Sequence, residues 1–209
     1  MITYEEALAL VKQAEPIGLL QSHIEAAQFA EFVANTIKPV HILEIGTCSG
    51  GNLYLMHLAA LADGAREGLR LSIDMPWSSR DPNVYGHEQR FKNVLQQVVE
   101  IIGNSHSPDT LRRVKEVLEF QAMAPSGDHL EAAKFDLIYQ DSDHTAEGSF
   151  QDFLDYSPLL RPGGYWAQHD CRNNHPCNAT AYRLDKMFPE HWIWTEESNL
   201  FGVGCWRIP

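Results

Sequence analysis

The stretch VHILEIGTCSGG, residues 40–51, decides the fold. Its first part, residues 40–45, is a mainly apolar run of strand length, and a glycine turn follows it without a gap. The residues after Gly51 predict a helix. A strand, a glycine turn and a helix N-terminus in this order predict a nucleotide-sized site at the carboxyl edge of a parallel sheet.

The spacing of the glycines argues against three common kinds of site. A dinucleotide-binding turn needs glycines at positions 46, 48 and 51, but the middle position is Cys48. A Walker loop needs a lysine after its last glycine, and no lysine lies between Val40 and Lys92. The GxSxG spacing of an esterase nucleophile does not occur in the chain. NAD, ATP and acyl-enzyme chemistry are therefore disfavoured.

Short apolar runs alternate with segments of helix length in the rest of the chain, which predicts parallel strands joined by crossover helices. Further strands are expected over residues 69–73, 98–102, 135–139 and 164–168. Helices are expected over residues 52–62, 87–96, 108–120, 146–156 and 180–187. Ser107 and Pro108 favour the start of the third of these helices, because a hydroxyl at the N-cap and a proline after it are typical there. Two aromatic-rich runs are expected to form a closing hairpin, residues 191–195 and 201–207.

Two helices are expected before the first strand. Both start with the spacing of a capping box, in which a hydroxyl and a carboxylate bind backbone N–H groups reciprocally; the pairs are Thr3 with Glu6 and Ser22 with Glu25. We expect residues 1–38 to form a helical cap on the sheet and residues 40–209 to form the core. No linker, repeat or shift in composition divides the chain, so residues 1–209 are predicted to be a single domain.

The composition is that of a globular protein with an acidic surface. The chain has 28 acidic against 16 basic residues, a net charge of −12 and 44% hydrophobic residues. An acidic surface repels phosphate backbones and lipid headgroups, so no nucleic acid and no membrane are expected as partners. The N-terminus lacks a basic region and no apolar stretch reaches the ~18 residues of a membrane span, which predicts a cytoplasmic protein with free cysteines.

The glycine turn reads ExGxxxG and resembles the first motif of the class I S-adenosylmethionine-dependent methyltransferases. The resemblance implies a doubly wound α/β fold of the Rossmann-like methyltransferase type, with a mostly parallel seven-stranded sheet and residues 40–209 as its catalytic core. It implies S-adenosylmethionine as the cofactor, bound in this turn by Glu44, Gly46, Thr47 and Gly50. A carboxylate beside a glycine turn suits this ligand, because it carries a sulfonium cation and an ammonium group but no phosphate. The alternative is that the glycines only mark a turn.

Two further places in the chain match the cofactor site that the resemblance implies. Asp74 ends the second predicted strand, where an acidic side chain can accept hydrogen bonds from both ribose hydroxyls. Asn104 and Ser105 follow the third strand, where the family has a polar residue near the adenine. The alternative for Asp74 is a simple turn former.

Acids and histidines follow the fourth and fifth predicted strands. Residues 135–144 read FDLIYQDSDH, and residues 159–170 read LLRPGGYWAQHD. These motifs resemble a methyltransferase subgroup and, more distantly, metal-dependent O-methyltransferases that act on catechols and macrolide sugars. The resemblance implies a metal site at Asp141, His169 and Asp170, with Asp141 also next to the cofactor. Family members more often have Asp-Asn or Glu-Asp after the fifth strand, so His169 leaves the identity of the metal open.

Parallel neighbouring strands lie about 4.8 Å apart, so these acids and His169 meet if the fourth and fifth strands are neighbours. Such a donor set suits Mg²⁺ or another divalent ion. The alternatives are a turn acid at Asp141 and a packed imidazole at His169. A second group, which comprises His169, Cys171, His175 and Cys177, does not have standard zinc-site spacing and is interpreted as part of a substrate-facing loop.

His144 lies where sugar O-methyltransferases of this type carry a proposed general base. An ordinary histidine pKa of about 6.5 suits a proton acceptor near neutral pH. An alcohol needs such a base, or a metal, to become a good nucleophile. His144 and Asp141 are therefore the candidate catalytic residues; the alternative for His144 is a helix cap or a hydrogen bond to substrate.

The Asn/Asp-Pro-Pro-aromatic motif of amino-methylating enzymes is absent from residues 141–144, which favours an oxygen nucleophile. We therefore predict metal-assisted transfer of a methyl group from S-adenosylmethionine to a hydroxyl of a small molecule or sugar. Two other functions stay open: a non-catalytic cofactor- or partner-binding module, and a metal-dependent hydrolase or hydroxylase. Residues 75–86 are interpreted as a lid over the site, and the alternative is an ordinary surface loop. The acceptor and the choice between monomer and homo-oligomer are not predicted.

Overall fold

The computed structural model describes residues 1–62, 64, 68–76, 98–123, 133–172, 175–196 and 201–209. The helix predicted over residues 87–96 and most of the lid predicted over residues 75–86 lie outside the described residues. No helix among the described residues is long and apolar enough to cross a membrane. All four cysteines have free thiols, as predicted.

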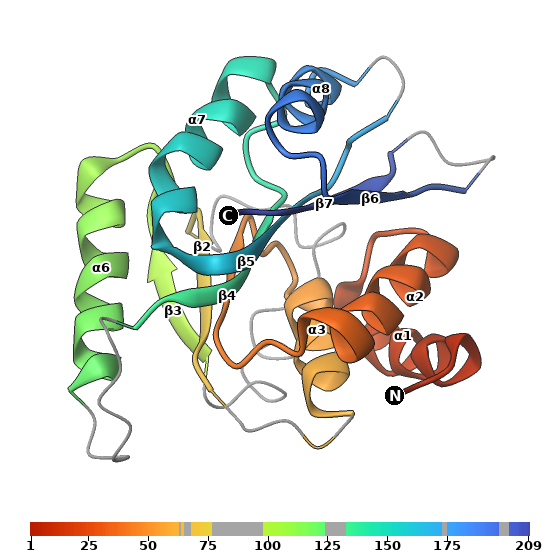
Figure 1. The fold of residues 1–209 in the computed structure, drawn as a ribbon. Helices are drawn as coiled ribbons and strands as arrows, with labels where there is room; N and C mark the ends of the chain where they lie inside the picture. Colours follow the sequence, from red (N-terminus) through yellow and green to blue (C-terminus); the bar gives the residue numbers. More distant parts are fainter. Residues whose placement is uncertain (63, 65–67, 77–97, 124–132, 173–174, 197–200) are drawn as a thin grey trace.

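A seven-stranded sheet forms the centre of the molecule, with the order β3-β2-β1-β4-β5-β7-β6 (Figure 1). β1 to β5 are parallel, and only β7 runs antiparallel to its neighbours β5 and β6. The sheet is thus mixed but mostly parallel, and the predicted doubly wound α/β fold is confirmed. The strands are β1 Ile42–Ile45, β2 Arg70–Asp74, β3 Val98–Ile102, β4 Phe135–Gln140, β5 Leu160–Gln168, β6 His191–Trp194 and β7 Val203–Arg207.

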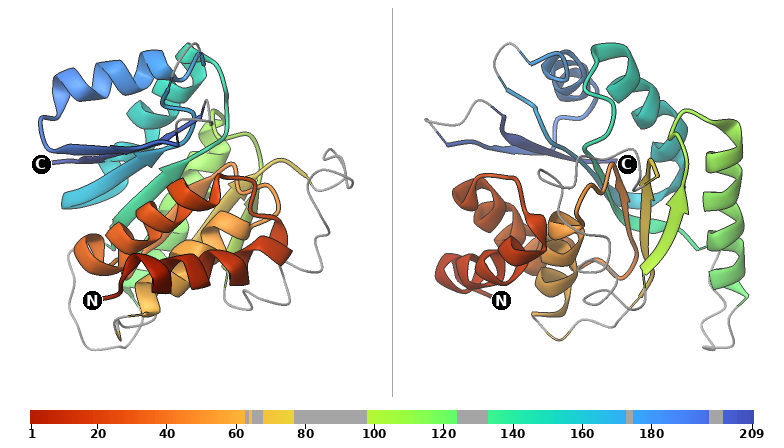
Figure 2. Two further views of the ribbon diagram at one scale, coloured as in Figure 1. Left: turned by 90° about the vertical axis from the view of Figure 1, so that its right-hand side faces the viewer. Right: turned by 180° about the vertical axis from the view of Figure 1, so that it is seen from behind.

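Helices cover both faces of the sheet (Figure 2). The first face packs on α1, α2 and α3, and the second on α6, α7 and α8. Neighbouring residues of a strand belong to opposite faces: Leu137 packs on the first face and Ile138 on the second. Both faces are covered, so β4 is buried along its whole length. The helices are α1 Tyr4–Gly18, α2 His23–Phe32, η1 Val33–Ile37, α3 Gly51–Leu61, α6 Pro108–Ala122, α7 Ala146–Tyr156, η3 Ser157–Leu159 and α8 Asn178–Met187.

One of the two predicted capping boxes is wrong. Thr3 and Glu6 form the expected box at the start of α1. Ser22 is the N-cap of α2 but makes no capping hydrogen bond; its hydroxyl donates to the Glu196 carboxylate at 2.5 Å. The Glu25 carboxylate accepts a hydrogen bond from the backbone N–H of Glu196 at 2.9 Å. Both side chains therefore hold the segment after β6 in place and do not cap the start of α2.

The fifth strand begins earlier than predicted. Leu160 already pairs with Phe135, and the register then shifts, so that Tyr165 pairs with Leu137. The Pro-Gly-Gly segment lies in this irregular part, where the N–H of Gly163 donates to the Ile208 carbonyl at 2.8 Å. The segment therefore belongs to β5. Likewise Ser107 is the N-cap of α6, but its hydroxyl makes no capping hydrogen bond.

Candidate active site

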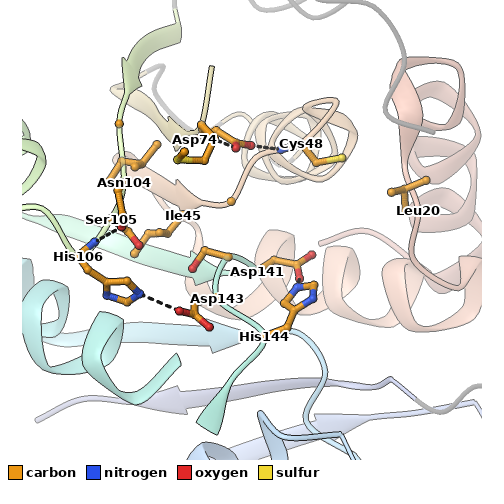
Figure 3. Close-up of a pocket in the computed structure, with 15 residues that line it drawn as sticks. Leu20, Ile45, Cys48, Asp74, Asn104, Ser105, His106, Asp141, Asp143 and His144 are labelled. Atoms are coloured by element: carbon orange, nitrogen blue, oxygen red, sulfur yellow. Dashed lines mark hydrogen bonds and ion pairs between the residues drawn. The ribbon is translucent and has the colours of Figure 1, made fainter. Parts of the chain in front are cut away.

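A cavity of about 500 Å³ opens at the carboxyl ends of β1, β2, β3 and β4 (Figure 3). This volume is in the usual range for a small-molecule site, roughly 300–1,000 Å³. Its position is the crevice where ligands bind to doubly wound sheets. The lining comes from Leu20 between α1 and α2 and from the ends of the four strands, namely Ile45, Gly46, Cys48, Ile73, Asp74, Met75, Gly103, Asn104, Ser105, His106, Asp141, Ser142, Asp143 and His144.

The glycine turn brings the ends of β1 and β4 into close contact. Gly46 has a φ of 83°, a left-handed conformation that favours glycine. A Cβ atom on Gly46 would lie 2.0 Å from the carbonyl oxygen of Asp141. Gly50, with a φ of 86°, is the N-cap of α3. The turn therefore requires glycine at position 46 both for its backbone conformation and for the close approach of Asp141.

Asp74, the last residue of β2, joins the glycine turn to the cavity (Figure 3). Its Oδ2 accepts a hydrogen bond from the backbone N–H of Cys48 at 2.5 Å, and its Oδ1 accepts one from the N–H of Met75 at 2.6 Å. Each carboxylate oxygen can accept a further hydrogen bond. Asp74 thus fixes the turn and presents a carboxylate to the cavity.

Three of the predicted cofactor-binding residues lie behind the cavity wall. Glu44 is only 2% exposed, and its Oε1 accepts a hydrogen bond from the Asn52 amide at 2.8 Å. Burial raises the pKa of Glu44 well above its ordinary value. Thr47 is buried and accepts a hydrogen bond from the Ser72 hydroxyl at 2.7 Å. Together with Gly50, these residues support the turn from inside, whereas the cavity is lined by Gly46, Asp74, Asn104, Ser105 and Asp141.

The loop after β3 carries His106, a histidine of the site that was not predicted from the sequence. Nε2 of His106 lies 3.2 Å from the carboxylate of Asp143, and both residues line the cavity (Figure 3). The Asn104 side chain accepts a hydrogen bond from the N–H of His106 at 2.9 Å, and the Ser105 carbonyl accepts one from the Tyr156 hydroxyl at 2.8 Å. The signal was present in the sequence, because His106 follows Asn104 and Ser105 directly and Asp143 belongs to the acid-histidine motif.

The residues predicted to bind a metal come together. β4 and β5 are neighbours, as that prediction required, and Gln140 pairs with Gln168 at their ends. Nδ1 of His169 lies 3.4 Å from Oδ1 of Asp141 and 3.3 Å from Oδ1 of Asp170. One ligand atom from each of the three residues lies within 4.8 Å of the others.

Two more histidines surround Asp170. Nε2 of His144 lies 3.3 Å from Oδ1 of Asp141 and 3.5 Å from Oδ2 of Asp170. Nε2 of His175 also lies 3.5 Å from Oδ2 of Asp170. His175 was expected only in a group with two cysteines, yet among the described residues neither Cys171 nor Cys177 belongs to a metal-capable group.

The carboxylates of Asp141 and Asp170 attract positive charge to this part of the site. Burial alone would raise the pKa of Asp141, but the charge of His169 and the hydrogen bond to His144 outweigh it and lower this pKa below its ordinary value. Burial alone would lower the pKa of His169, but Asp141 and Asp170 raise it to about 9. The hydrogen bond to Asp141 raises the pKa of His144. Protons on the imidazoles or a divalent cation can provide this positive charge.

The donor groups fit a divalent cation. The Asp170 side chain is only 4% exposed, and nitrogens of three histidines lie 3.3–3.5 Å from its oxygens. Burial of a carboxylate is costly unless positive charge lies beside it, either on these imidazoles or on a metal ion. Nitrogen and oxygen donors separated by about 3.3–3.4 Å can surround one ion at the usual ligand distances of about 2.0–2.2 Å.

The chain matches the family described as "Methyltransferase domain" over residues 43–171. No curated protein matches it. Similar solved structures include cofactor-bound Rv0187 from MTB, with 19% identity and a TM-score of 0.58 over 98% of this chain and 88% of that chain. The O-methyltransferase from Bacillus cereus in complex with SAH has 15% identity and a TM-score of 0.57 over 98% of this chain and 90% of that chain.

A third solved structure is the MycE methyltransferase from the mycinamycin biosynthetic pathway, in complex with Mg, SAH and mycinamycin VI. It has 14% identity and a TM-score of 0.59 over 96% of this chain and 54% of that chain. At such identities these structures show the common fold. The family match is the stronger finding, because it covers more than half of the chain, from β1 to the residue after Asp170. The chain therefore belongs to the methyltransferase domain family.

Proposed function

We propose that this methyltransferase transfers the methyl group of S-adenosylmethionine to a hydroxyl of a small molecule or sugar, with the help of a divalent cation. One observation carries the proposal: Asp141 and His144 line the cavity and also belong to the acid-histidine cluster. This cluster comprises Asp141, His144, His169, Asp170 and His175. A cofactor in the cavity would therefore lie next to groups that activate a hydroxyl. Proximity of this kind can remove ~7–11 kcal/mol of a reaction barrier.

The cavity has polar groups suited to the cofactor. Asp74 can accept hydrogen bonds from ribose hydroxyls, and we place the adenine near Asn104 and Ser105. Gly46 and Asp141 would lie near the methionine part, where a carboxylate attracts the sulfonium and ammonium charges. Glu44, Thr47 and Gly50 would act indirectly, because they hold the turn in place.

We place the divalent cation at Asp141, His169 and Asp170. Such an ion would lower the pKa of a hydroxyl of the acceptor. His144 would take the hydroxyl proton at Nε2, and the Asp141 carboxylate, whose Oδ1 lies 3.3 Å from that nitrogen, would then accept a hydrogen bond from it and stabilise the charged imidazole. The His144 side chain is 55% exposed, so an acceptor can reach it from solvent. Mg²⁺ is the first ion to test, because MycE was solved with Mg.

We propose that residues 1–209 act as one catalytic domain. The helices of the cap, residues 1–38, share one hydrophobic core with α3 and the sheet. Leu20, between α1 and α2, also lines the cavity. Residues 40–209 carry the acids and histidines of the site.

The test is methyl transfer from tritium-labelled S-adenosylmethionine to a panel of sugars, glycosides and phenols. We expect label in a hydroxyl-bearing acceptor, with loss of turnover in His144→Ala and in Asp141→Asn. EDTA should also abolish turnover but leave cofactor affinity unchanged. Full turnover in excess EDTA would contradict the role of the metal. Metal-dependent turnover of an ester or another substrate without S-adenosylmethionine would instead support a hydrolase or hydroxylase.

A further inference from the structure

A second group of metal-type donors lies beside the proposed cation site. Its members are His144, Asp170 and His175, and one ligand atom from each lies within 4.8 Å of the others. The two imidazoles approach the same oxygen of Asp170: both Nε2 atoms lie 3.5 Å from Oδ2. Their rings are edge-on to each other, with centroids 5.6 Å apart. Three potential ligand atoms are thus close enough to bind one ion.

The two groups share Asp170 but use different oxygens of it. Oδ1 of Asp170 faces His169, in the group with Asp141, whereas Oδ2 faces His144 and His175. A carboxylate can bridge two cations in this way, as in two-metal sites with ions roughly 3.5–4 Å apart. His175 belongs only to the second group, and Asp141 belongs only to the first. Substitutions can therefore separate the two groups.

We propose that His144, Asp170 and His175 form a second cation subsite that binds a first-row transition metal in preference to Mg²⁺. Two imidazoles and one carboxylate are a donor set typical of zinc and iron sites, whereas Mg²⁺ takes oxygen ligands and retains water. His175 is 22% exposed and His144 is 55% exposed, so an ion can enter from solvent. The subsite therefore differs in chemistry from an oxygen-rich magnesium site.

Occupation of this subsite has a consequence that rests on the proposed function. The lone pair of His144 Nε2 would be bound to the metal, and the same nitrogen could not accept the proton of the acceptor hydroxyl. Zn²⁺ or Co²⁺ would therefore inhibit methyl transfer. The binding of the metal itself does not depend on the proposed function.

The test is a titration of the tag-free protein with Co²⁺, in 5 mM Mg²⁺ and without cofactor or acceptor, followed by the visible absorption of imidazole-bound Co²⁺. Wild type and Asp141→Asn are expected to develop the band. His175→Ala and His144→Ala are each expected to bind Co²⁺ at least ~10-fold more weakly. His23→Ala, which removes an exposed histidine of α2, is the matched control. Circular dichroism establishes that each variant is folded.

The outcomes separate this proposal from the proposed function. Wild-type Co²⁺ affinity in His175→Ala would overturn the subsite. Equal losses of Co²⁺ affinity in His175→Ala and Asp141→Asn would also overturn it, because they would indicate one merged site. A protein that binds Co²⁺ as expected but transfers no methyl group would refute the proposed function alone. Where turnover is found, Zn²⁺ should lower the rate of wild type by a larger factor than that of His175→Ala.

Discussion

Replacement of Gly46 by alanine adds one methyl group where the end of β1 passes the end of β4. The methyl carbon would lie 2.0 Å from the Asp141 carbonyl oxygen and 2.7 Å from the Cα atom of Ser142. These are backbone atoms, so a change of side-chain rotamer cannot relieve the overlap. The carboxyl end of β4 must move, and it carries the acids of the site. We therefore expect Gly46→Ala to lower both the stability and the cofactor affinity.

Gly64→Ala is a matched control for this substitution. Gly64 also has a left-handed backbone, with a φ of 74°, but a Cβ atom there would meet no atom of the described residues within 4 Å. Both variants should lose about 1–2 kcal/mol through the left-handed conformation. Only Gly46→Ala has the overlap, which costs a further ~1–3 kcal/mol by analogy with overpacked cores. The difference between the two variants is therefore expected to be about 1–3 kcal/mol.

Urea unfolding of wild type, Gly46→Ala and Gly64→Ala measures this difference directly. Calorimetric titration with S-adenosylmethionine then shows whether cofactor affinity falls in Gly46→Ala and not in Gly64→Ala. Equal losses of stability in the two variants would refute the reasoning, because the close approach to Asp141 would then have no cost. So would wild-type cofactor affinity in Gly46→Ala.

Three further predictions concern single side chains. Asp74→Ala should weaken S-adenosylmethionine binding by about 10- to 150-fold, since hydrogen bonds to a charged group contribute ~1.5–3 kcal/mol; unchanged affinity by calorimetry would contradict this. Burial raises the pKa of Glu44, so the folded protein retains a proton that the unfolded chain releases, and wild type loses stability as the pH rises above about 4.5. Glu44→Gln should therefore be more stabilising at pH 8 than at pH 5 in urea unfolding, and a pH-independent effect would refute the assignment. Tyr156→Phe removes the hydrogen bond to the Ser105 carbonyl and should destabilise the fold by about 1 kcal/mol; an unchanged urea midpoint would show that the bond contributes nothing.

The order of strands and helices could be predicted because the sheet is covered on both faces. A strand such as β4, buried along Phe135–Gln140, forms a short and mainly apolar run, and the covering helices have apolar faces of a different period. The helix predicted over residues 146–156 has these same bounds in α7. The meeting of Asp141 with His169 also followed from the sequence, since it required only that β4 and β5 be neighbours.

Other features depend on contacts between distant segments. Ser22 and Glu25 have capping-box spacing, but Glu196 competes for both side chains from the other end of the chain. No local pattern shows that Glu44 lies behind the cavity wall, because its burial depends on α3 and the neighbouring strands. The contact of His175 with Asp170 depends on how the chain returns after β5, where Asp170 itself has a φ of 59°.

The most direct test of the proposed function is a calorimetric titration of the folded wild-type protein with S-adenosylmethionine, with NAD and ATP titrated under the same conditions. The cavity, its carboxylates and the methyltransferase family predict saturable binding of one S-adenosylmethionine per chain. They also predict much weaker binding of NAD and ATP, because the glycine turn has neither a dinucleotide-type glycine at position 48 nor a phosphate-binding lysine. No saturable binding of S-adenosylmethionine, or tighter binding of NAD or ATP, would contradict the proposal.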